Sequence, residues 1–302
     1  MTSQKHATLY ALATVLCWST VATAFKLTLA HLNPMQLILL SSLASWVFLL
    51  AVLAWQGRIK ELLSQSASAY RWSVLFGLMN PCVYYFLLFS AYDGLPAQEA
   101  QAINYSWAII MSLLAVPLLA QKLSRFDLMA AILCYLGVLI IATRGDVLGL
   151  NFANVKGVLL AVASTLVWSL YWIFNQKDPR EPIVGLCLNF TVAVPILLLV
   201  AFLSGDLNAL IAKPWPAFAG GVYIGVFEMG LAFVLWLKAM KLAENTSRIA
   251  NLIFISPFLS LIFISVFLGE KILSSTLVGL AMIIAGLVLQ QKFAKAELAI
   301  KE

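Results

Sequence analysis

Ten apolar stretches constrain what this chain can fold into more than any other feature of the sequence. Each has roughly the 20 residues that a helix needs to cross a hydrocarbon core of about 30 Å. Short polar segments rich in turn-forming and charged residues separate them. We therefore predict an all-α integral membrane protein with ten transmembrane helices. The stretches are residues 7–29, 35–56, 71–91, 97–120, 126–143, 156–175, 183–204, 215–238, 246–268 and 273–291.

Composition argues against a soluble domain anywhere in the chain. Of the 302 residues, 63% are hydrophobic and 11% are charged, whereas about a quarter of a soluble domain is charged. The four cysteines lie inside apolar stretches without CxxC spacing, so neither a disulfide framework nor a zinc site is expected. We predict no metal and no cofactor. The cysteines are Cys17, Cys82, Cys134 and Cys187.

The basic residues predict the orientation of the helices. If the N-terminus is cytoplasmic, 14 of the 19 lysines and arginines fall in cytoplasmic segments, as the positive-inside rule requires. Both termini are then cytoplasmic, and the expected location is the bacterial inner (cell) membrane, crossed many times. The net charge of +6 follows from this bias, so no nucleic-acid partner is expected.

The start of the chain, MTSQKHATLYALATVLCWSTVATA, also allows a second interpretation. It contains a basic residue, an apolar run and an Ala-Thr-Ala ending, which is typical of a cleaved secretory signal. Cleavage would leave nine spans. Against this, the same segment recurs later in the chain and so behaves as structure.

The chain contains an internal repeat. ALATVLCWS, residues 11–19, aligns with AVASTLVWS, residues 161–169, and the two share a Trp-Ser pair. Further matches follow at nearly the same offset, which predicts two five-helix repeats, residues 1–146 and 147–302. These matches are Gly77 with Gly225, Ala91 with Ala239, Lys122 with Lys271, and Gly137 with Gly286.

An odd number of helices in each repeat gives the two repeats opposite orientations in the membrane. Inverted repeats typically hold a substrate near the midplane and rock against each other, which is alternating access. The repeat therefore favours a transporter. Two fused packing units without a transport role are the alternative, because duplication alone proves no activity.

The end of the chain resembles a known family. ISPFLSLIFISVFLGEKI, residues 255–272, followed by GLAMIIAGLVL, is similar to the drug/metabolite transporter superfamily, specifically its EamA-type members. The resemblance covers essentially the whole chain. Two departures stand in the first half, where Gln121 replaces the family Glu and Trp107-Ala108 replaces the Ser-Pro. These two departures, together with QKHATLYALATVLCWST at the start of the chain and INYSWAII in the fourth stretch, make the chain most similar to aromatic amino acid exporters of the YddG type.

The fourth apolar stretch carries an unusual number of polar side chains. Gln101, Asn104, Tyr105 and Ala108 share one face of a helix, with Trp107 beside it. Unsatisfied polar groups are costly in hydrocarbon, so this face should line the bundle interior or a water-filled cavity. We interpret it as one wall of a substrate chamber. Interhelical hydrogen bonding without a ligand is the alternative.

Other stretches supply further candidates for that chamber. Asn80 and Tyr84 stand at helical spacing around Pro81, which can interrupt the backbone ladder. Trp18 and Trp168 lie about halfway along their stretches, which argues against an interfacial aromatic belt; Trp172 follows on the same helix as Trp168. The resemblance implies an aromatic-lined central cavity, with Tyr84, Tyr105, Trp107 and Trp168 at the matching positions.

Glu228 is the acidic residue deepest inside a stretch, and an ionisable group in a membrane is a functional candidate by default. It is interpreted as a site for a substrate ammonium group or a coupling proton. A neutral, hydrogen-bonded carboxyl without a transport role is the alternative.

Together these features predict a secondary transporter that exports amino acids, aromatic and other apolar ones preferred. Its partners are a small-molecule substrate and the lipid bilayer, and we expect a monomer. Exporters of other small metabolites or of organic cations remain an alternative. A membrane-embedded enzyme is less favoured because no catalytic cluster or phosphate-binding motif is present in the sequence. An open channel would need filter motifs that neither half contains.

Overall fold

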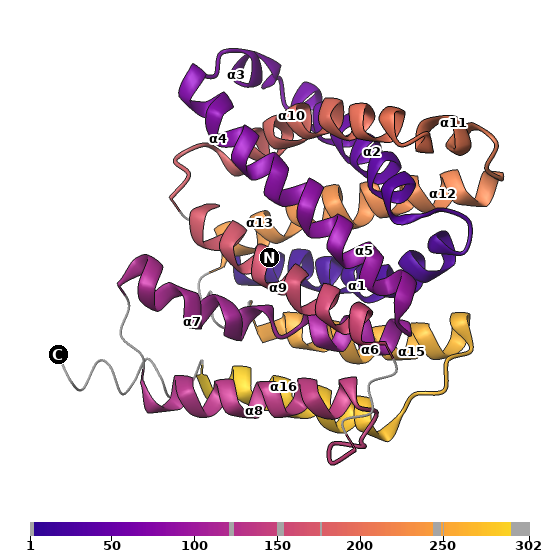
Figure 1. The fold of residues 1–302 in the computed structure, drawn as a ribbon. Coiled ribbons are helices and arrows are strands. Elements are labelled where there is room, and N and C mark those ends of the chain that lie inside the picture. Colours follow the sequence, from indigo (N-terminus) through magenta and orange to yellow (C-terminus); the bar gives the residue numbers. More distant parts are fainter. Residues whose placement is uncertain are drawn as a thin grey trace. The chain divides into compact units, whose positions relative to one another are not determined.

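The computed structural model describes residues 3–120, 124–149, 154–175, 177–243, 249 and 251–290. Over these residues the chain forms helices joined by short turns and contains no strand (Figure 1). The all-α prediction is therefore confirmed. A helix satisfies its backbone hydrogen bonds within one segment, which is what an apolar chain in lipid requires.

Eight helical segments are long and apolar enough to cross a membrane. Two shorter apolar helices, Leu252–Leu268 and Ser274–Leu289, cover about 25 Å at a rise of 1.5 Å per residue. The chain is thus a multi-pass membrane protein, and every predicted stretch contains a helix. The eight segments are Gln4–Leu29, Pro34–Trp55, Ala67–Gly94, Ala97–Leu119, Arg125–Ala142, Val155–Asn175, Pro182–Leu203 and Trp215–Leu242.

Several of these segments are built from more than one element, and short helices occupy two of the connections. In chain order the elements are α1 (Ser3–Leu29), α2 (Pro34–Trp55), α3 (Ile59–Leu63), α4 (Ala67–Gly77), η1 (Leu78–Val83), α5 (Tyr84–Gly94), α6 (Ala97–Asn104), α7 (Trp107–Leu119), α8 (Arg125–Ala142), α9 (Val155–Asn175), α10 (Pro182–Leu203), α11 (Asp206–Ile211), α12 (Trp215–Tyr223), η2 (Ile224–Leu231), α13 (Ala232–Leu242), η3 (Asn251–Ile255), α15 (Ser256–Leu268) and α16 (Ser274–Leu289).

Three segments depart from a plain α-helix. The eighth contains the π-helical element η2, which is wider than an α-helix and shifts the faces of the residues that follow. The third has a kink at Asn80, within η1. The fourth covers the predicted range but is interrupted at Tyr105 and Ser106, between α6 and α7. Both residues keep right-handed helical dihedral angles, with φ and ψ of −61° and −13° at Tyr105 and −68° and −9° at Ser106. The face shared by Gln101, Asn104, Tyr105 and Ala108 therefore stays a prediction. Asn, Tyr and Ser are weaker helix formers than the leucines and alanines around them.

Helix bounds recur along the chain at the spacing of the sequence repeat. α2 and α10 each have 22 residues and begin at a proline, Pro34 in the first half and Pro182 in the second. α7 and α15 each have 13 residues and begin at positions separated by nearly the same offset. Both end at a residue with left-handed backbone, Ala120 at a φ of 54° and Gly269 at 65°. The lengths of these two pairs of helices thus recur in the second half.

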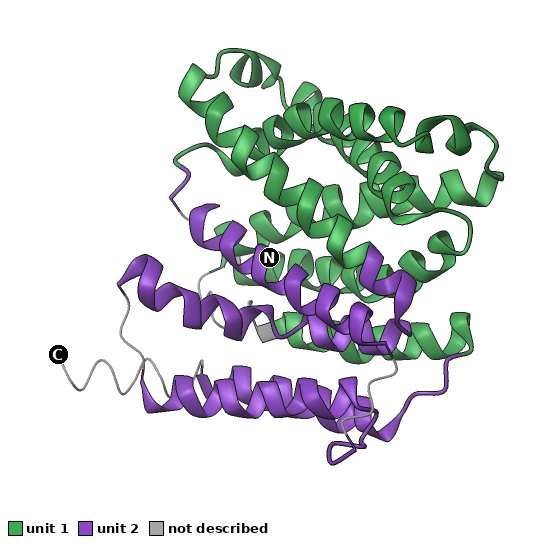
Figure 2. Cartoon of the chain, in the orientation of Figure 1, with its two compact units in different colours: residues 1–89, 179–269 green, residues 90–178, 270–302 purple. Residues whose placement is uncertain are grey.

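The chain divides into two compact units, and each draws on both halves of the sequence (Figure 2). Unit 1 consists of residues 1–89 and 179–269, and unit 2 of residues 90–178 and 270–302. The compact units therefore do not coincide with the predicted repeats, whose boundary at residues 146 and 147 stays a prediction.

In unit 1, α1 packs against α13 and α15, and α2 packs against α10 and η2. Two glycines make the same kind of contact in this unit. A Cβ added to Gly77 would lie 2.6 Å from the backbone oxygen of Asn189, and one added to Gly225 would meet the backbone oxygen of Ser41. Gly77 is separated from Gly225 by the same offset in sequence as Ser41 is from Asn189. One repeat contact is therefore made twice.

In unit 2, α8 packs against α16, while α6 and α7 pack against α9. The α8–α16 contact is close because Gly137 and Gly279 face each other. A Cβ on Gly137 would lie 2.6 Å from the backbone oxygen of Gly279, and a Cβ on Gly279 would lie 2.5 Å from that of Gly137. Small residues permit this approach between helices in a membrane.

Two carboxylates hold the start of α6 within unit 2. Glu270 accepts hydrogen bonds from the backbone N–H groups of Ala97, at 2.8 Å, and Gln98, at 3.3 Å. Glu99 is buried and pairs with the Arg144 guanidinium at 2.7 Å. Negative charge at a helix N-terminus is favourable, so both carboxylates have a structural role.

Candidate functional site

The predicted acidic candidate, Glu228, lies on η2 in unit 1 and is 8% exposed. Its Oε1 accepts a hydrogen bond from the Tyr85 hydroxyl at 3.1 Å. Its Oε2 is buried and has no hydrogen-bond partner. An unsatisfied buried carboxyl oxygen costs free energy, so this group retains the capacity to take up a proton or a ligand donor.

Asn80 lies on η1, in the same unit, and is almost completely buried. Its backbone leaves helical geometry, with φ of −142° and ψ of 113°, and the following residue is Pro81. The side-chain Oδ1 has no hydrogen-bond partner. The unpartnered oxygens of Asn80 and Glu228 thus lie in the same unit, on η1 and η2.

Tyr84, a candidate lining residue by sequence, lies next to Tyr85, whose hydroxyl reaches Glu228. The two rings meet edge to face, with centroids 4.7 Å apart, and both side chains are buried. Asn80 leaves helical geometry, so a helical spacing counted from it does not decide which face Tyr84 presents. The place of Tyr84 in a substrate cavity stays a prediction.

Trp18 belongs to a purely aromatic contact in unit 1. Its ring lies 6.4 Å from that of Phe233 and 5.6 Å from that of Trp236, measured between centroids. Both partners lie on α13, against which α1 packs. This position is explained by helix packing, and Trp18 is half-buried.

The polar candidates of the fourth segment lie in unit 2, at the end of α6 and in the break after it. Gln101 is buried and its Oε1 has no hydrogen-bond partner. Asn104 donates a hydrogen bond from Nδ2 to the Ser164 hydroxyl of α9 at 3.3 Å. Tyr105 occupies the break and is half-buried. Interhelical hydrogen bonding thus accounts for Asn104, whereas Gln101 keeps an open acceptor.

Trp107 opens α7 directly after the break and begins a group of four aromatic rings, hereafter the aromatic cluster: Trp107, Trp168, Tyr171 and Trp172. The Trp107 and Trp168 rings meet edge to face at 6.4 Å. Trp168 stacks on Tyr171 at 5.6 Å and meets Trp172 edge to face at 5.7 Å. The Trp172 Nε1 is buried without a hydrogen-bond partner.

A hydrogen bond joins α9 to the start of α7 beside the aromatic cluster. The Ser169 hydroxyl donates to the backbone oxygen of Trp107 at 2.8 Å. The structure thus gathers Trp107, Trp168 and Trp172 in unit 2, with Tyr171 as a member that the sequence prediction omitted.

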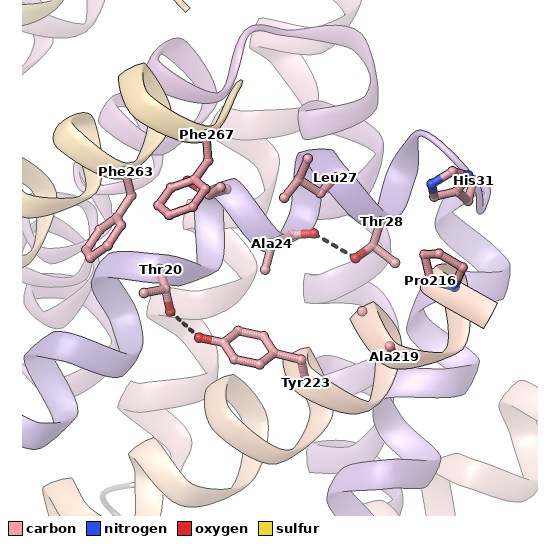
Figure 3. Close-up of a pocket in the computed structure, with 12 residues that line it drawn as sticks. Thr20, Ala24, Leu27, Thr28, His31, Pro216, Ala219, Tyr223, Phe263 and Phe267 are labelled. Atoms are coloured by element: carbon pink, nitrogen blue, oxygen red, sulfur yellow. Dashed lines mark hydrogen bonds between the residues drawn. The ribbon is translucent and has the colours of Figure 1, made fainter. Parts of the chain in front are cut away.

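The structure also contains a pocket of about 560 Å³ in unit 1 that the sequence analysis missed (Figure 3). It is lined by α1, α12 and α15. Figure 3 shows Thr20 hydrogen-bonded to Tyr223, and Phe263 and Phe267 of α15 also line the pocket. A threonine or phenylalanine in an apolar stretch carries no distinctive pattern, so only the tertiary contacts single these residues out.

The arrangement suits recognition and release better than bond chemistry. Within the described residues, no three His, Cys, Asp or Glu side chains gather to hold a metal ion. Aromatic rings supply dispersion and edge-to-face contact, while Gln101, Trp172, Asn80 and Glu228 each offer an unpartnered polar atom.

Comparison with known proteins gives a consistent result. A sequence model of a family described as "EamA-like transporter family" matches residues 6–143 and 155–290. The aromatic amino acid exporter YddG of Ancylobacter novellus is 28% identical over 79% of this chain and 81% of its own. A probable amino-acid metabolite efflux pump of Salmonella typhimurium is 25% identical over 92% of both chains. One solved crystal structure shares the fold, with 22% identity and a TM-score of 0.63 over 96% of this chain and 98% of that one.

Proposed function

The chain belongs to the EamA-like transporter family, and on that premise we propose that it exports amino acids, aromatic and other apolar ones preferred, by alternating access. Its activity is transport rather than catalysis. The proposed location is the bacterial inner membrane, with both termini cytoplasmic and the two repeats, residues 1–146 and 147–302, inverted with respect to each other.

The aromatic cluster is the observation that carries this proposal. Four rings gather beside an interrupted helix, and one of them, Trp172, has an unpartnered N–H group. Edge-to-face and stacked rings favour an aromatic side chain by about 0.5–1.5 kcal/mol per pair beyond area burial. Gln101, with an open acceptor oxygen, is the proposed partner of a substrate N–H group. The proposed substrate cavity is lined by these side chains.

Glu228 is the proposed site of the coupling proton or of the substrate ammonium group. Its Oε2 is buried and unpartnered, and a carboxylate in a dry environment is costly unless it is paired or protonated. Proton uptake and ammonium binding both relieve that cost.

Exchange of radiolabelled phenylalanine in proteoliposomes tests the assignment. We expect saturable exchange whose KM rises about 2- to 13-fold in Trp107→Ala, which corresponds to the loss of one ring contact. Trp55→Ala removes a ring that is 84% exposed and is the matched control, expected to keep the native KM. If the native protein exchanges no phenylalanine saturably, the proposed substrate class is wrong.

The same liposomes test the role of Glu228. A pH gradient should accelerate export by the native chain and by Glu61→Gln, which changes a carboxylate whose side chain is 51% exposed. In Glu228→Gln the gradient should have no effect. If Glu228→Gln still responds to the gradient, another group carries the proton.

Export of organic cations is the second candidate, and the free carboxyl oxygen of Glu228 favours it. A buried carboxylate would serve as the counter-charge of the cation. Saturable exchange of tetraphenylphosphonium in the absence of phenylalanine exchange would replace the amino acid proposal with this one.

A further inference from the structure

The pocket of unit 1 has the features of a second ligand site, hereafter the α1 pocket. Its volume of about 560 Å³ lies within the roughly 300–1,000 Å³ of typical small-molecule pockets. None of its 12 lining residues is among the residues assigned above to transport. Figure 3 shows that α1 supplies Thr20, Ala24, Leu27 and Thr28, while α15 supplies Phe263 and Phe267.

The α1 pocket lies along exposed apolar faces of its helices. Leu16, one turn before Thr20 on α1, is 56% exposed, and the lining residue Leu27 is 50% exposed. On α15 the neighbours Ile262 and Val266 are 59% and 70% exposed. In a membrane protein such leucine, isoleucine and valine faces contact lipid. A ligand can therefore reach the pocket from the bilayer.

Thr23 has an unused hydroxyl in this lining. It is 6% exposed, and its Oγ1 has no hydrogen-bond partner. Other threonines of α1 donate to a backbone oxygen one turn earlier, as Thr8, Thr14 and Thr28 do. Thr23 is thus an exception on its own helix, and a buried unmade hydrogen bond is costly.

Tyr223 offers a second polar contact. Thr20 donates its hydroxyl hydrogen to the backbone oxygen of Cys17 at 2.8 Å. A hydroxyl has one hydrogen, so in the 2.6 Å contact between Thr20 and Tyr223 the tyrosine is the donor. The Tyr223 oxygen is then oriented as an acceptor. The pocket offers one acceptor at Tyr223 and a hydroxyl at Thr23 that can donate or accept.

The charge of the lining restricts the ligand. Among the 12 described residues that line the pocket there is no Asp, Glu, Lys or Arg. The lining histidine, His31, is exposed, so a zwitterionic amino acid would bury its charges without a buried charged partner, which is strongly unfavourable. A lipid acyl chain would fill the space but leave the Thr23 hydroxyl unsatisfied. A neutral aromatic molecule with one N–H or O–H group meets both requirements.

We propose that the α1 pocket binds a neutral, bilayer-soluble aromatic molecule, such as an indole or a phenol, whose polar hydrogen is accepted by the Thr23 hydroxyl and whose ring packs on Phe263 and Phe267. This site differs from the proposed amino acid site in its residues and in the charge of its ligand.

Binding of 5-fluoroindole to the protein in lipid nanodiscs tests the proposal, because detergent would compete for the same space. Fluorine NMR titration, corrected with empty nanodiscs of the same lipid, gives the bound fraction. We expect saturable binding that weakens about 2- to 10-fold in Thr23→Val, which removes one hydrogen-bonding group at constant shape. Thr8→Val, on the same helix outside the pocket, should bind as the native protein does.

A second variant tests whether the probe occupies the pocket itself. Ala24→Phe fills the pocket without altering a hydroxyl and should abolish saturable binding. The thermal unfolding midpoints of Thr23→Val and Ala24→Phe report whether each variant keeps its fold. Phenylalanine should not compete with the probe. Native protein that binds no more probe than empty nanodiscs overturns the proposal. Binding that is equal in Thr23→Val and the native protein also overturns it and indicates an acyl-chain site instead.

Discussion

At the scale of single residues, the buried polar atoms separate structural from functional positions. Asn104, a candidate by sequence, has a partner in Ser164. Glu228, Asn80, Gln101 and Trp172 each keep a buried polar atom without a partner. Because such atoms are rare and costly in native proteins, the second group is where we expect a substrate or a proton.

The Tyr85 hydroxyl is expected to tune Glu228. In Tyr85→Phe the Glu228 carboxyl loses its hydrogen bond of 3.1 Å, so proton-driven export in liposomes should fall about 2- to 13-fold. Tyr70→Phe changes a ring that is 38% exposed and should leave the rate unchanged. An unaltered rate in Tyr85→Phe would mean that this hydrogen bond has no part in transport.

At the scale of helices, close backbone approach determines which elements pair. Gly137 and Gly279 let the backbones of α8 and α16 touch. Gly77 does the same for α4 against α10, and Gly225 for η2 against α2. Between helices in lipid there is little hydrophobic driving force, so packing of this kind supplies the association.

A methyl group at Gly137 should therefore loosen unit 2. In Gly137→Ala the new Cβ would meet the Gly279 backbone oxygen at 2.6 Å, and overpacking of this kind costs about 1–3 kcal/mol. Thermal unfolding of the purified protein should show a lower midpoint. Leu136→Ala, at an adjacent residue that is 46% exposed, is the control, and an equal midpoint in the two variants would contradict the proposed contact.

At the scale of the whole chain, duplication is expressed in contacts as well as in sequence. The matched bounds of α2 with α10 and of α7 with α15, and the paired glycine contacts of unit 1, recur at the offset of the sequence repeat. They support the two-repeat proposal, and the proposed orientation of those repeats in the membrane follows from the distribution of basic residues.

Cysteine labelling tests that orientation directly. In a chain whose native cysteines are replaced, an impermeant maleimide should label His31→Cys in intact cells, and Ser64→Cys only after the membrane is broken. Both positions are exposed, and they lie in segments predicted on opposite sides. Labelling of Ser64→Cys alone in intact cells would reverse the predicted topology.

Hydrophobic length and local motifs were sufficient to predict the all-helical, multi-pass character and the family resemblance. They also identified Glu228, Trp107 and Trp168 as unusual residues for a membrane. That the Tyr85 hydroxyl reaches Glu228, that Tyr171 joins the aromatic cluster, and that the Thr23 hydroxyl has no partner in a pocket became visible only in the fold. These features depend on contacts between segments distant in sequence, which hydrophobic periodicity does not encode.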